Sequence, residues 1–570
     1  MAIENLITDH LDLWTSAVRP KSSAGRGSNS KLELTGIKKL RELILELAVR
    51  GKLVPQDPND EPASVLLARI AADKAQLVKA GKIKKEKQYS AITKTELPSH
   101  MPNGWVFERF GNVLINRDFE RIPLAVSDRE KRKGPYDYYG ASGVIDHIDE
   151  YLFDKPLLLI GEDGANLINR STPIAFMARG KYWVNNHAHV LDGLNEELLL
   201  YVCLHINAIS LEPYITGTAQ PKMNQAKMNE IILGIPPASE QHRIVAKVDE
   251  LMALCDQLEQ HSESQLAAHQ TLVEALLATL TDSVDAEELA QNWARLSTHF
   301  DTLFTTEASI DALKKTILQL AVMGKLVPQD PSNEPASTLL ERIAAEKSRL
   351  AKEKKIKKEK LLPAISQEEK QFELPQGWGW FRLCELGVFF GGKTPSKMKP
   401  EYWGGDIPWV TPKDMKVDYI INSEDYVTEL AISDGLTLVE RGSLLFVARS
   451  GILRRKFPVA IATVTCTVNQ DLKVLRPIDD RLTPYIHLMM KGFEEYILKN
   501  LTKVGTTVES LVFDEFSIHP FMLPPLFEQN SIVAKVDELM ILCDQLKSCL
   551  QTSQQTQLAL TESLVEGALA

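Results

Sequence analysis

Apolar residues recur with a heptad rhythm in two stretches of the chain. From Ile244 the apolar positions alternate intervals of four and three residues as far as Leu258, and the same pattern starts again at Ile532. Such a seam is typical of long helices that pack along one stripe. The pattern therefore predicts two long coiled-coil helices.

Shorter helical patterns occur earlier in each half of the chain. The segment from Ile37 to Arg50 is amphipathic, and Gly51 stands where a left-handed residue can end the helix. Gly324 repeats this arrangement, and prolines follow both glycines. We expect a rigid corner and then a second helix with Pro62, or Pro335 in the copy, in its first turn.

The segments between these helices have a different pattern. Short apolar runs such as PLLLIGEDG and GSLLFVARSG alternate with Gly, Pro, Asn and Asp. Runs of this kind, bounded by turn residues, indicate strands rather than helices. Two mixed α/β modules are therefore predicted, one in each half.

The chain is an internal duplication. GKLVPQD occurs at 51–57 and at 324–330, an offset of 273 residues, whereas IVAKVDELM occurs at 244–252 and 532–540, an offset of 288. The segment between the two repeated blocks is thus 15 residues longer in the second half. The predicted fold class is α+β, with two mixed α/β domains separated by long repeated helices. We divide the chain into an N-terminal helical framework (1–105), a first variable domain (106–235), a central helical region (236–378), a second variable domain (379–523) and a C-terminal helix (524–570).

Composition is that of a soluble intracellular protein. Hydrophobic residues make up 44% of the chain, but no apolar run approaches the roughly 18 residues that a membrane span needs. The N-terminus lacks a signal-peptide pattern, so we expect a cytoplasmic location. The six cysteines show no C-x-x-C spacing, and Cys255 and Cys543 hold equivalent helical positions. Core packing is therefore favoured over a metal site or a disulfide.

Charge does not by itself favour nucleic acid as a ligand. The chain has 65 basic and 76 acidic residues, a net charge of −11. The two KIKKEK segments are interpreted as solvated helix ends. Any contact with DNA has to come from local basic clusters. The candidates are Lys131, Arg132 and Lys133 in the first variable domain, and Arg449, Arg454, Arg455 and Lys456 in the second.

One enzyme motif is present and is rejected. Gly387, Gly392, Lys393 and Thr394 satisfy the pattern of a phosphate-binding loop. That loop must open a helix whose N-terminus faces the phosphates, and Pro395 with the prolines that follow would interrupt such a helix. With no other catalytic constellation in the sequence, we predict a noncatalytic protein.

The repeated blocks resemble a known family. The pairs AVRGKLVPQDP and AVMGKLVPQDP, and IPPASEQHRIVAKVDEL and LPPLFEQNSIVAKVDEL, together with TPSKMKPEYWGGDIPWVTPKDM at 394–415, are similar to the specificity subunit of Type I restriction-modification systems. The resemblance covers nearly the whole chain. The N-terminal stretch MAIENLITDHLDLWTSAV departs from the family pattern, and we expect it to be a helical part of the framework.

This resemblance implies a function. The variable middles would be target recognition domains, each reading one half of an asymmetric, interrupted site on double-stranded DNA. The repeated helices would form an antiparallel coiled coil that docks two modification subunits, which are methyltransferases. The complex would also contain restriction subunits with translocase and endonuclease activity. No cofactor is expected in this chain, because S-adenosylmethionine, ATP and Mg²⁺ would bind to the partner subunits.

Base-reading candidates come from weak similarity between the two middles. VNNHAHVL at 184–191 parallels VNQDLKVL at 468–475, and GTAQ at 217 parallels GTTV at 505. Amides, hydroxyls and basic groups can bind base edges or phosphates, although they are also ordinary turn residues. The base-reading candidates are Asn185, Asn186, Gln220 and Lys222 in the first domain, and Lys393, Thr411, Lys413, Arg449, Asn469 and Gln470 in the second. Further DNA-binding candidates are Gly217, Thr218, Arg454, Thr506 and Thr507.

Two other functions fit parts of the pattern. A coiled-coil adaptor that binds two proteins would share the repeats but would show no sequence preference on DNA. A nucleotide hydrolase would use Gly392 to Thr394 and would turn over ATP as an isolated chain.

Overall fold

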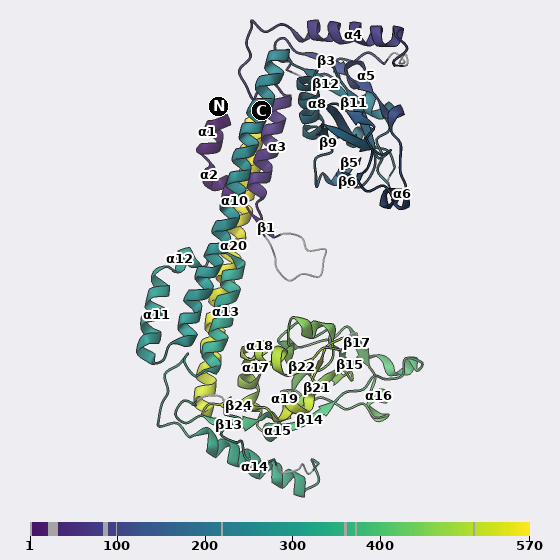
Figure 1. Ribbon diagram of the computed structural model, residues 1–570. Helices are drawn as coiled ribbons and strands as arrows, with labels where there is room; N and C mark the ends of the chain where they lie inside the picture. The colour runs from purple at the N-terminus through teal and green to yellow at the C-terminus, as the bar shows by residue number, and fades with distance from the viewer. Residues whose placement is uncertain are drawn as a thin grey trace. The chain divides into compact units, whose positions relative to one another are not determined.

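The computed structural model describes residues 3–20, 32–83, 89–98, 100–217, 220–357, 362–370, 373–505 and 508–570. They form two compact units, the first comprising 1–266 with 552–570 and the second 267–551. Each unit contains a helical part and a mixed α/β domain (Figure 1). The expected long helices are confirmed as α10 (Ala238–Asp282) and α20 (Leu526–Leu569), and each contributes residues to both units.

In the part of the chain that the structure describes, the first unit contains further helices and strands in addition to its parts of α10 and α20. Its helices are α1 (Ile3–Thr8), α2 (Leu11–Ser16), α3 (Thr35–Val49), α4 (Ala63–Lys79), α5 (Phe110–Val113), η1 (Asp118–Glu120), α6 (Val126–Glu130), α7 (Asn166–Asn169), α8 (Glu196–Ala208), η2 (Glu212–Tyr214) and α9 (Gln225–Asn229). Its strands are β1 (Arg19–Pro20), β2 (Leu32–Glu33), β3 (Val106–Arg109), β4 (Ile115–Asn116), β5 (Tyr136–Gly140), β6 (Gly143–Ile148), β7 (Phe153–Asp154), β8 (Leu157–Gly161), β9 (Ala175–Ala178), β10 (Lys181–Val184), β11 (Ala188–Asp192) and β12 (Ile232–Ile235).

The second unit repeats this organisation. Its helices are α11 (Ala286–Thr298), α12 (Phe300–Leu303), α13 (Glu307–Val322), α14 (Ala336–Lys352), α15 (Leu383–Leu386), η3 (Pro400–Tyr402), α16 (Glu429–Ser433), η4 (Gly451–Arg454), η5 (Asp480–Leu482), α17 (Thr483–Gly492), α18 (Glu494–Asn500) and α19 (Phe513–Ile518). Its strands are β13 (Gly379–Arg382), β14 (Gly387–Gly391), β15 (Trp403–Val410), β16 (Tyr419–Ile420), β17 (Asp425–Val427), β18 (Leu444–Val447), β19 (Val459–Ala462), β20 (Thr467–Val468), β21 (Leu472–Pro477), β22 (Thr502–Lys503), β23 (Ser510–Leu511) and β24 (Pro520–Leu523).

The two variable domains form sheets, as their strand and turn patterns predicted. In the first unit the strand order is β4-β11-β8-β9 in one sheet and β6-β5-β10-β7 in another. In the second unit the main sheet has the order β14-β21-β18-β19-β16. Each domain starts and ends on a paired strand, since β3 pairs with β12 and β13 pairs with β24. Both variable domains are therefore closed modules of mixed α/β structure.

The helical part of each unit is built on the predicted apolar seam. In the first unit Ile244, Val248, Leu251 and Cys255 of α10 are buried with α3 and the last turns of α20 in one core. In the second unit the equivalent face of α20, starting at Ile532, is buried with α13 and the last turns of α10. Cys255 and Cys543 are both buried, as expected from their place on the seam.

The repeated GKLVPQD motif is a corner that ends one helix and caps another. Gly51 and Gly324 have φ of +66° and +69° and end α3 and α13 as predicted. The next residue is a lysine in both copies. Lys52 Nζ donates to the main-chain oxygen of Leu569 at 2.8 Å, and Lys325 Nζ donates to those of Thr281 and Ser283 at 2.7 and 2.8 Å. A cation at these orphan carbonyls stabilises a helix C-terminus, so each copy of the motif caps the last turn of a long helix.

A buried tryptophan and glutamate join the start of each variable domain to a long helix. Trp105 Nε1 donates to Glu240 Oε1 at 3.1 Å, and Trp378 Nε1 donates to Glu528 Oε1 at 3.0 Å. All four side chains are buried. Both pairs belong to the repeated blocks, so the framework on each side of the variable domains is held in the same way.

Two details of the framework complete or correct the sequence expectations. The N-terminal stretch does form helices, α1 and α2, and the fully buried Trp14 packs them against α3. The helices come so close that a Cβ at Gly36 would lie 2.2 Å from the main-chain oxygen of Trp14.

The expected place of Pro62 and Pro335 is wrong by one position. Both have extended backbone and immediately precede α4 and α14 instead of lying in the first turn.

Rejection of the phosphate-binding loop is confirmed by the local structure. Residues Gly387 to Gly391 form strand β14, and the described residues from 392 to 399 contain no helix. A Cβ at Gly392 would lie 1.8 Å from the main-chain oxygen of Val468. This glycine is therefore required by close packing against a neighbouring strand.

Among the described residues, no helix is long and apolar enough to cross a membrane.

Candidate nucleic-acid interface

The two variable domains share a backbone framework at one end of their central strands. Glu162 N donates to His187 O at 2.9 Å in the first domain, and Ala448 N donates to Asp471 O at 2.8 Å in the second. Glu162 and Ala448 each also accept a main-chain bond of 2.8 Å from a following segment, donated by Met223 and by Leu511. These matched bonds define equivalent positions in the two domains.

An isolated β-bridge extends the equivalence by one residue. Asp163 is bridged to Lys222, and Arg449 is bridged to Ser510. The segments that carry these partners are hairpins in both domains, because Thr216 pairs with Lys222 and Lys503 pairs with Ser510. The described residues of GTAQ and GTTV belong to the segments between these paired residues. Thr218, Thr506 and Thr507 fall outside the described residues, whereas Gly217 has a φ of +83° and Gln220 is exposed.

Asn185 and Asn469 occupy equivalent places, but the prediction that they face DNA is not supported. Both are buried. Asn185 Oδ1 accepts from His187 N at 2.8 Å, and Asn469 Oδ1 accepts from Asp471 N at 3.0 Å. An asparagine that bonds to the main chain two residues ahead forms an Asx turn. The amides therefore shape the turn that presents the exposed residues Asn186 and Gln470.

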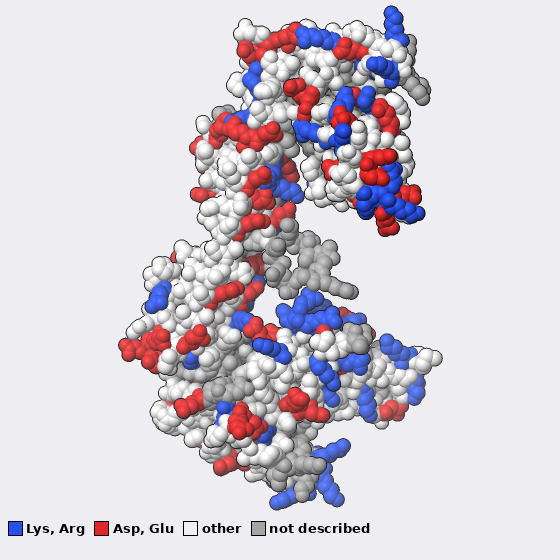
Figure 2. Space-filling view, in the orientation of Figure 1, with Lys and Arg blue, Asp and Glu red and all other residues white. Residues whose placement is uncertain are grey.

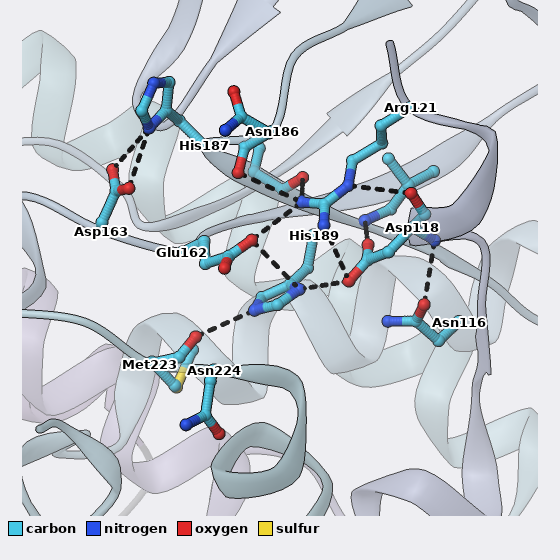
Figure 3. Close-up of polar contacts among 12 residues, drawn as sticks. Asn116, Asp118, Arg121, Glu162, Asp163, Asn186, His187, His189, Met223 and Asn224 are labelled. Atoms are coloured by element: carbon cyan, nitrogen blue, oxygen red, sulfur yellow. Dashed lines mark hydrogen bonds and ion pairs between the residues drawn. The ribbon is translucent and has the colours of Figure 1, made fainter. Parts of the chain in front are cut away.

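A buried charged network lies beneath this turn in the first domain (Figure 3). His189 is fully buried, with Nδ1 2.6 Å from Asp118 Oδ2 and Nε2 2.9 Å from the main-chain oxygen of Met223. Carboxylate and carbonyl oxygens only accept hydrogen bonds, so both ring nitrogens of His189 must carry protons. A cationic imidazole thus joins η1 to the segment that follows the hairpin.

Arginine and lysine complete the network. Arg121 Nη1 donates to Glu162 Oε2 at 2.9 Å, and its Nη2 lies 3.3 Å from Asp118 Oδ2. Lys222 Nζ lies 3.1 Å from Glu162 Oε1. The predicted base-reading residue Lys222 is therefore paired with an acidic side chain, although its own side chain is half exposed.

The cations control the protonation of the two carboxyl groups. Burial desolvates Asp118 and by itself would raise its pKa, but the hydrogen bond and charge of His189 and the charge of Arg121 outweigh burial and lower the pKa. Burial acts in the same way on Glu162. There the hydrogen bond from Arg121 and the charge of His189 lower the pKa below its usual value. Both groups are thus held as carboxylates.

Asp118, Glu162 and His189 also have the residue types of a metal site, with ligand atoms within 4.8 Å of one another. A divalent ion would need lone pairs on the carboxylate oxygens of Asp118 and Glu162, which already accept hydrogen bonds from His189 and Arg121. His189 itself has no free ring nitrogen to offer. The ion would also lie beside a guanidinium and an imidazolium. The chemistry of the cluster therefore fits an ion-pair network better than a metal site.

The equivalent place in the second domain is built differently. Lys473, which replaces His189, lies with Nζ 4.7 Å from the centre of the Phe513 ring. Arg454 forms an ion pair with the buried Glu509. Arg449 is exposed and forms no side-chain hydrogen bond or ion pair with any residue that the structure describes. Lys and Arg side chains gather on this α/β domain in Figure 2.

Several other predicted DNA contacts are already engaged within the chain. Arg132 pairs with Asp149 and Glu150, and Lys133 pairs with Asp146, so that most of the first basic cluster is neutralised. Lys131 is exposed. In the second domain three residues have turn roles or distant partners. Thr411 Oγ1 donates to Asp414, Gln470 accepts from Thr394, and Lys413 lies 3.8 Å from Glu424. Lys393 is exposed, with Nζ 3.5 Å from the main-chain oxygen of Gly435. Base contact by these residues stays a prediction.

Sequence reasoning missed the buried network of the first domain. Asp118, Arg121, Glu162 and His189 stand far apart in the chain and form no motif. It also missed Asp163 and His187, whose side chains pair at 2.8 Å. A signal for His187 was present, because alignment of the two middles through VNNHAHVL and VNQDLKVL places His187 opposite Asp471.

Comparison with known proteins identifies the family. The sequence profile described as Type I restriction modification DNA specificity domain matches residues 103–268 and 375–553. The chain therefore belongs to this family, and it contains the specificity domain twice.

Curated relatives are similar over their full length. The chain is 41% identical to the Type I restriction enzyme EcoEI specificity subunit of Escherichia coli, with 100% of each chain covered. It is 39% identical to the EcoAI specificity subunit of the same organism, again over 100% of each chain. A solved chain from work on complex assembly and conformational transition of the type I R-M system has 16% identity and a TM-score of 0.46, over 83% of this chain and 99% of that chain. The family assignment rests on the sequence relationships.

Proposed function

We propose that this chain supplies DNA sequence recognition to a Type I restriction-modification complex, and that each α/β domain reads one half of a bipartite, asymmetric site. One observation carries the proposal. The two domains keep the same backbone framework while equivalent positions hold different side chains, such as Asp163 and Arg449. A shared framework with divergent polar side chains suits two readers of one ligand class, because base edges specify sequence through the side chains that meet them.

The helical framework would dock the partner proteins. Support comes from large apolar side chains that α20 and α10 leave exposed, among them Ile541, Leu542 and Leu560 of α20 and Leu272 of α10. Large apolar side chains that stay exposed on a helix, such as the adjacent Ile541 and Leu542, favour contact with another protein. The partners would be two modification subunits, with restriction subunits joining the complex. This chain would be noncatalytic, and S-adenosylmethionine, ATP and Mg²⁺ would bind to the partners.

Methylation mapping of the host genome by long-read sequencing tests the proposal. Deletion of this gene should remove methylation from one asymmetric motif made of two short specific parts and an unspecific spacer. Restoration of the gene should bring the same motif back. Methylation that is identical with and without the gene would contradict the proposal.

The coiled-coil adaptor is the second candidate, and a separate measurement distinguishes it. A purified complex of this chain with its modification subunits should bind the mapped motif more tightly than a duplex of scrambled sequence at the same salt concentration. Equal affinity for the two duplexes would favour the adaptor.

A further inference from the structure

Asp163 and Arg449 occupy the same place in their respective domains. Each is the second residue after a buried central strand, β8 or β18, and each is bridged to the hairpin that follows. The neighbouring residue is fixed by two main-chain hydrogen bonds in both domains. Because the backbone is held in the same way, the two side chains start from equivalent and rigid positions.

The chemistry at this place is opposite in the two domains. His187 Nδ1 lies 2.8 and 3.0 Å from the two carboxylate oxygens of Asp163. A carboxylate only accepts, so Nδ1 carries the proton, and in the neutral ring Nε2 is left as an acceptor. The side chains of Asp163 and His187 are 32% and 51% exposed, so a ligand can reach them. This pair therefore presents acceptors to solvent.

The second domain presents a donor instead. Arg449 is exposed and has no side-chain partner among the described residues. The residue equivalent to His187 is Asp471, and its Oδ2 accepts from Asn469 Nδ2 at 3.1 Å. The guanidinium of Arg449 is thus available to a ligand, and its planar fork suits bidentate recognition.

We infer that the Asp163–His187 pair and Arg449 are equivalent base-reading positions of opposite hydrogen-bonding character. Asp163 and His187 accept from the exocyclic amino group of cytosine or adenine in the major groove, whereas Arg449 donates to O6 and N7 of guanine. The inference rests on the proposed function, which it deepens by naming one specificity-determining position in each half.

Single substitutions in the complete complex with the modification subunits test the inference. The probes are duplexes of the mapped site in which each base pair is replaced in turn. Asp163→Asn keeps the shape of the side chain but adds a donor, and it should reduce discrimination at one base pair of one half-site by about 5- to 150-fold. His187→Gln should reduce discrimination at the same base pair.

Arg449→Lys keeps the charge but removes the planar guanidinium and its paired donors. It should reduce discrimination at one G·C pair in the other half-site by a similar factor. Replacement of that guanine by 7-deazaguanine should weaken binding of the unaltered complex, and it should weaken binding of the Arg449→Lys complex much less. Arg441→Lys is the matched control, since Arg441 is an exposed arginine of the same domain and is not among the predicted DNA contacts. It should leave the base profile unchanged.

The possible failures are distinguishable. If the unaltered complex prefers no sequence, the proposed function itself is wrong. If the unaltered complex is specific but Asp163→Asn and Arg449→Lys leave the profile unchanged at every base pair, only the base-reading inference is wrong. An Arg449→Ala complex that loses affinity equally for all sequences would assign Arg449 to a phosphate and would also overturn the inference.

Discussion

Removing the carboxyl group of Glu240 should destabilise the first unit by a predictable amount. In Glu240→Ala the buried indole of Trp105 loses the acceptor that it now has at 3.1 Å. A buried donor without a partner costs about 1 to 3 kcal/mol. For a unit of this size, that loss lowers the melting temperature by about 2 to 12 °C. Glu240→Gln keeps an acceptor in the same place, and its melting temperature should stay above that of the alanine variant.

The same pair predicts a dependence of stability on pH. Burial desolvates Glu240 and raises its pKa, and the hydrogen bond from Trp105 and the charge of Arg243 only partly offset this effect. The folded chain thus keeps this proton to a higher pH than the unfolded chain does. Stability from this group is fully present below the unfolded pKa and is lost as the pH rises through the folded pKa. Glu240→Gln should remove that loss.

The assay is thermal unfolding of the full chain, followed by tryptophan fluorescence between about pH 4 and pH 8. Glu263→Gln is a matched control, because Glu263 is an exposed glutamate of the same helix. Glu528 offers a replicate, since its pKa is also raised by burial and it binds Trp378 in the second unit. The changes in unfolding free energy caused by substitutions at the two sites should add. Equal melting temperatures for the alanine and glutamine variants, with unchanged pH profiles, would refute the reasoning.

Three further outcomes are expected. Lys52→Met and Lys325→Met should each destabilise the last turn of a long helix by about 0.3 to 1 kcal/mol, seen as faster amide hydrogen exchange there, and unchanged exchange would contradict the cap. Gly36→Ala should lower the melting temperature because the added Cβ would lie 2.2 Å from a main-chain oxygen, whereas Gly567→Ala, with no atom within 4 Å, should be neutral or slightly stabilising. Arg121→Met should cost about 3 to 5 kcal/mol of unfolding free energy at neutral pH, since it leaves the buried carboxylate of Glu162 and the largely buried carboxylate of Asp118 without their guanidinium. Those carboxyl groups have lowered pKa values, so the stability that they contribute is lost in acid, and the difference from the unaltered chain should shrink as the pH falls.

The framework could be predicted from sequence because its signals are local and periodic. The heptad spacing from Ile244 and Ile532 predicted α10 and α20, and Gly51 and Gly324 were predicted to end α3 and α13. Each of these features depends on a few consecutive residues. Repetition within the chain also made every signal appear twice, which separated it from chance.

The candidate site could be predicted only in part. The similarity of VNNHAHVL to VNQDLKVL marked structurally equivalent turns, but it could not tell the buried Asn185 from the exposed Asn186 beside it. The ion-pair network of Arg121 joins residues that are distant in the chain, and single charged residues carry no spacing that would indicate their partners. Such contacts depend on tertiary packing.

Exchange of one variable domain is the most direct test of the central claim. Residues 106–235 would be replaced by the corresponding segment of a relative that directs methylation of a different site, and the methylated motif of the host would be mapped. The account predicts that one half of the motif changes to that of the relative while the half read by residues 379–523 stays the same. A change in both halves, or a functional complex whose motif does not change, would contradict the assignment of one half-site to each domain.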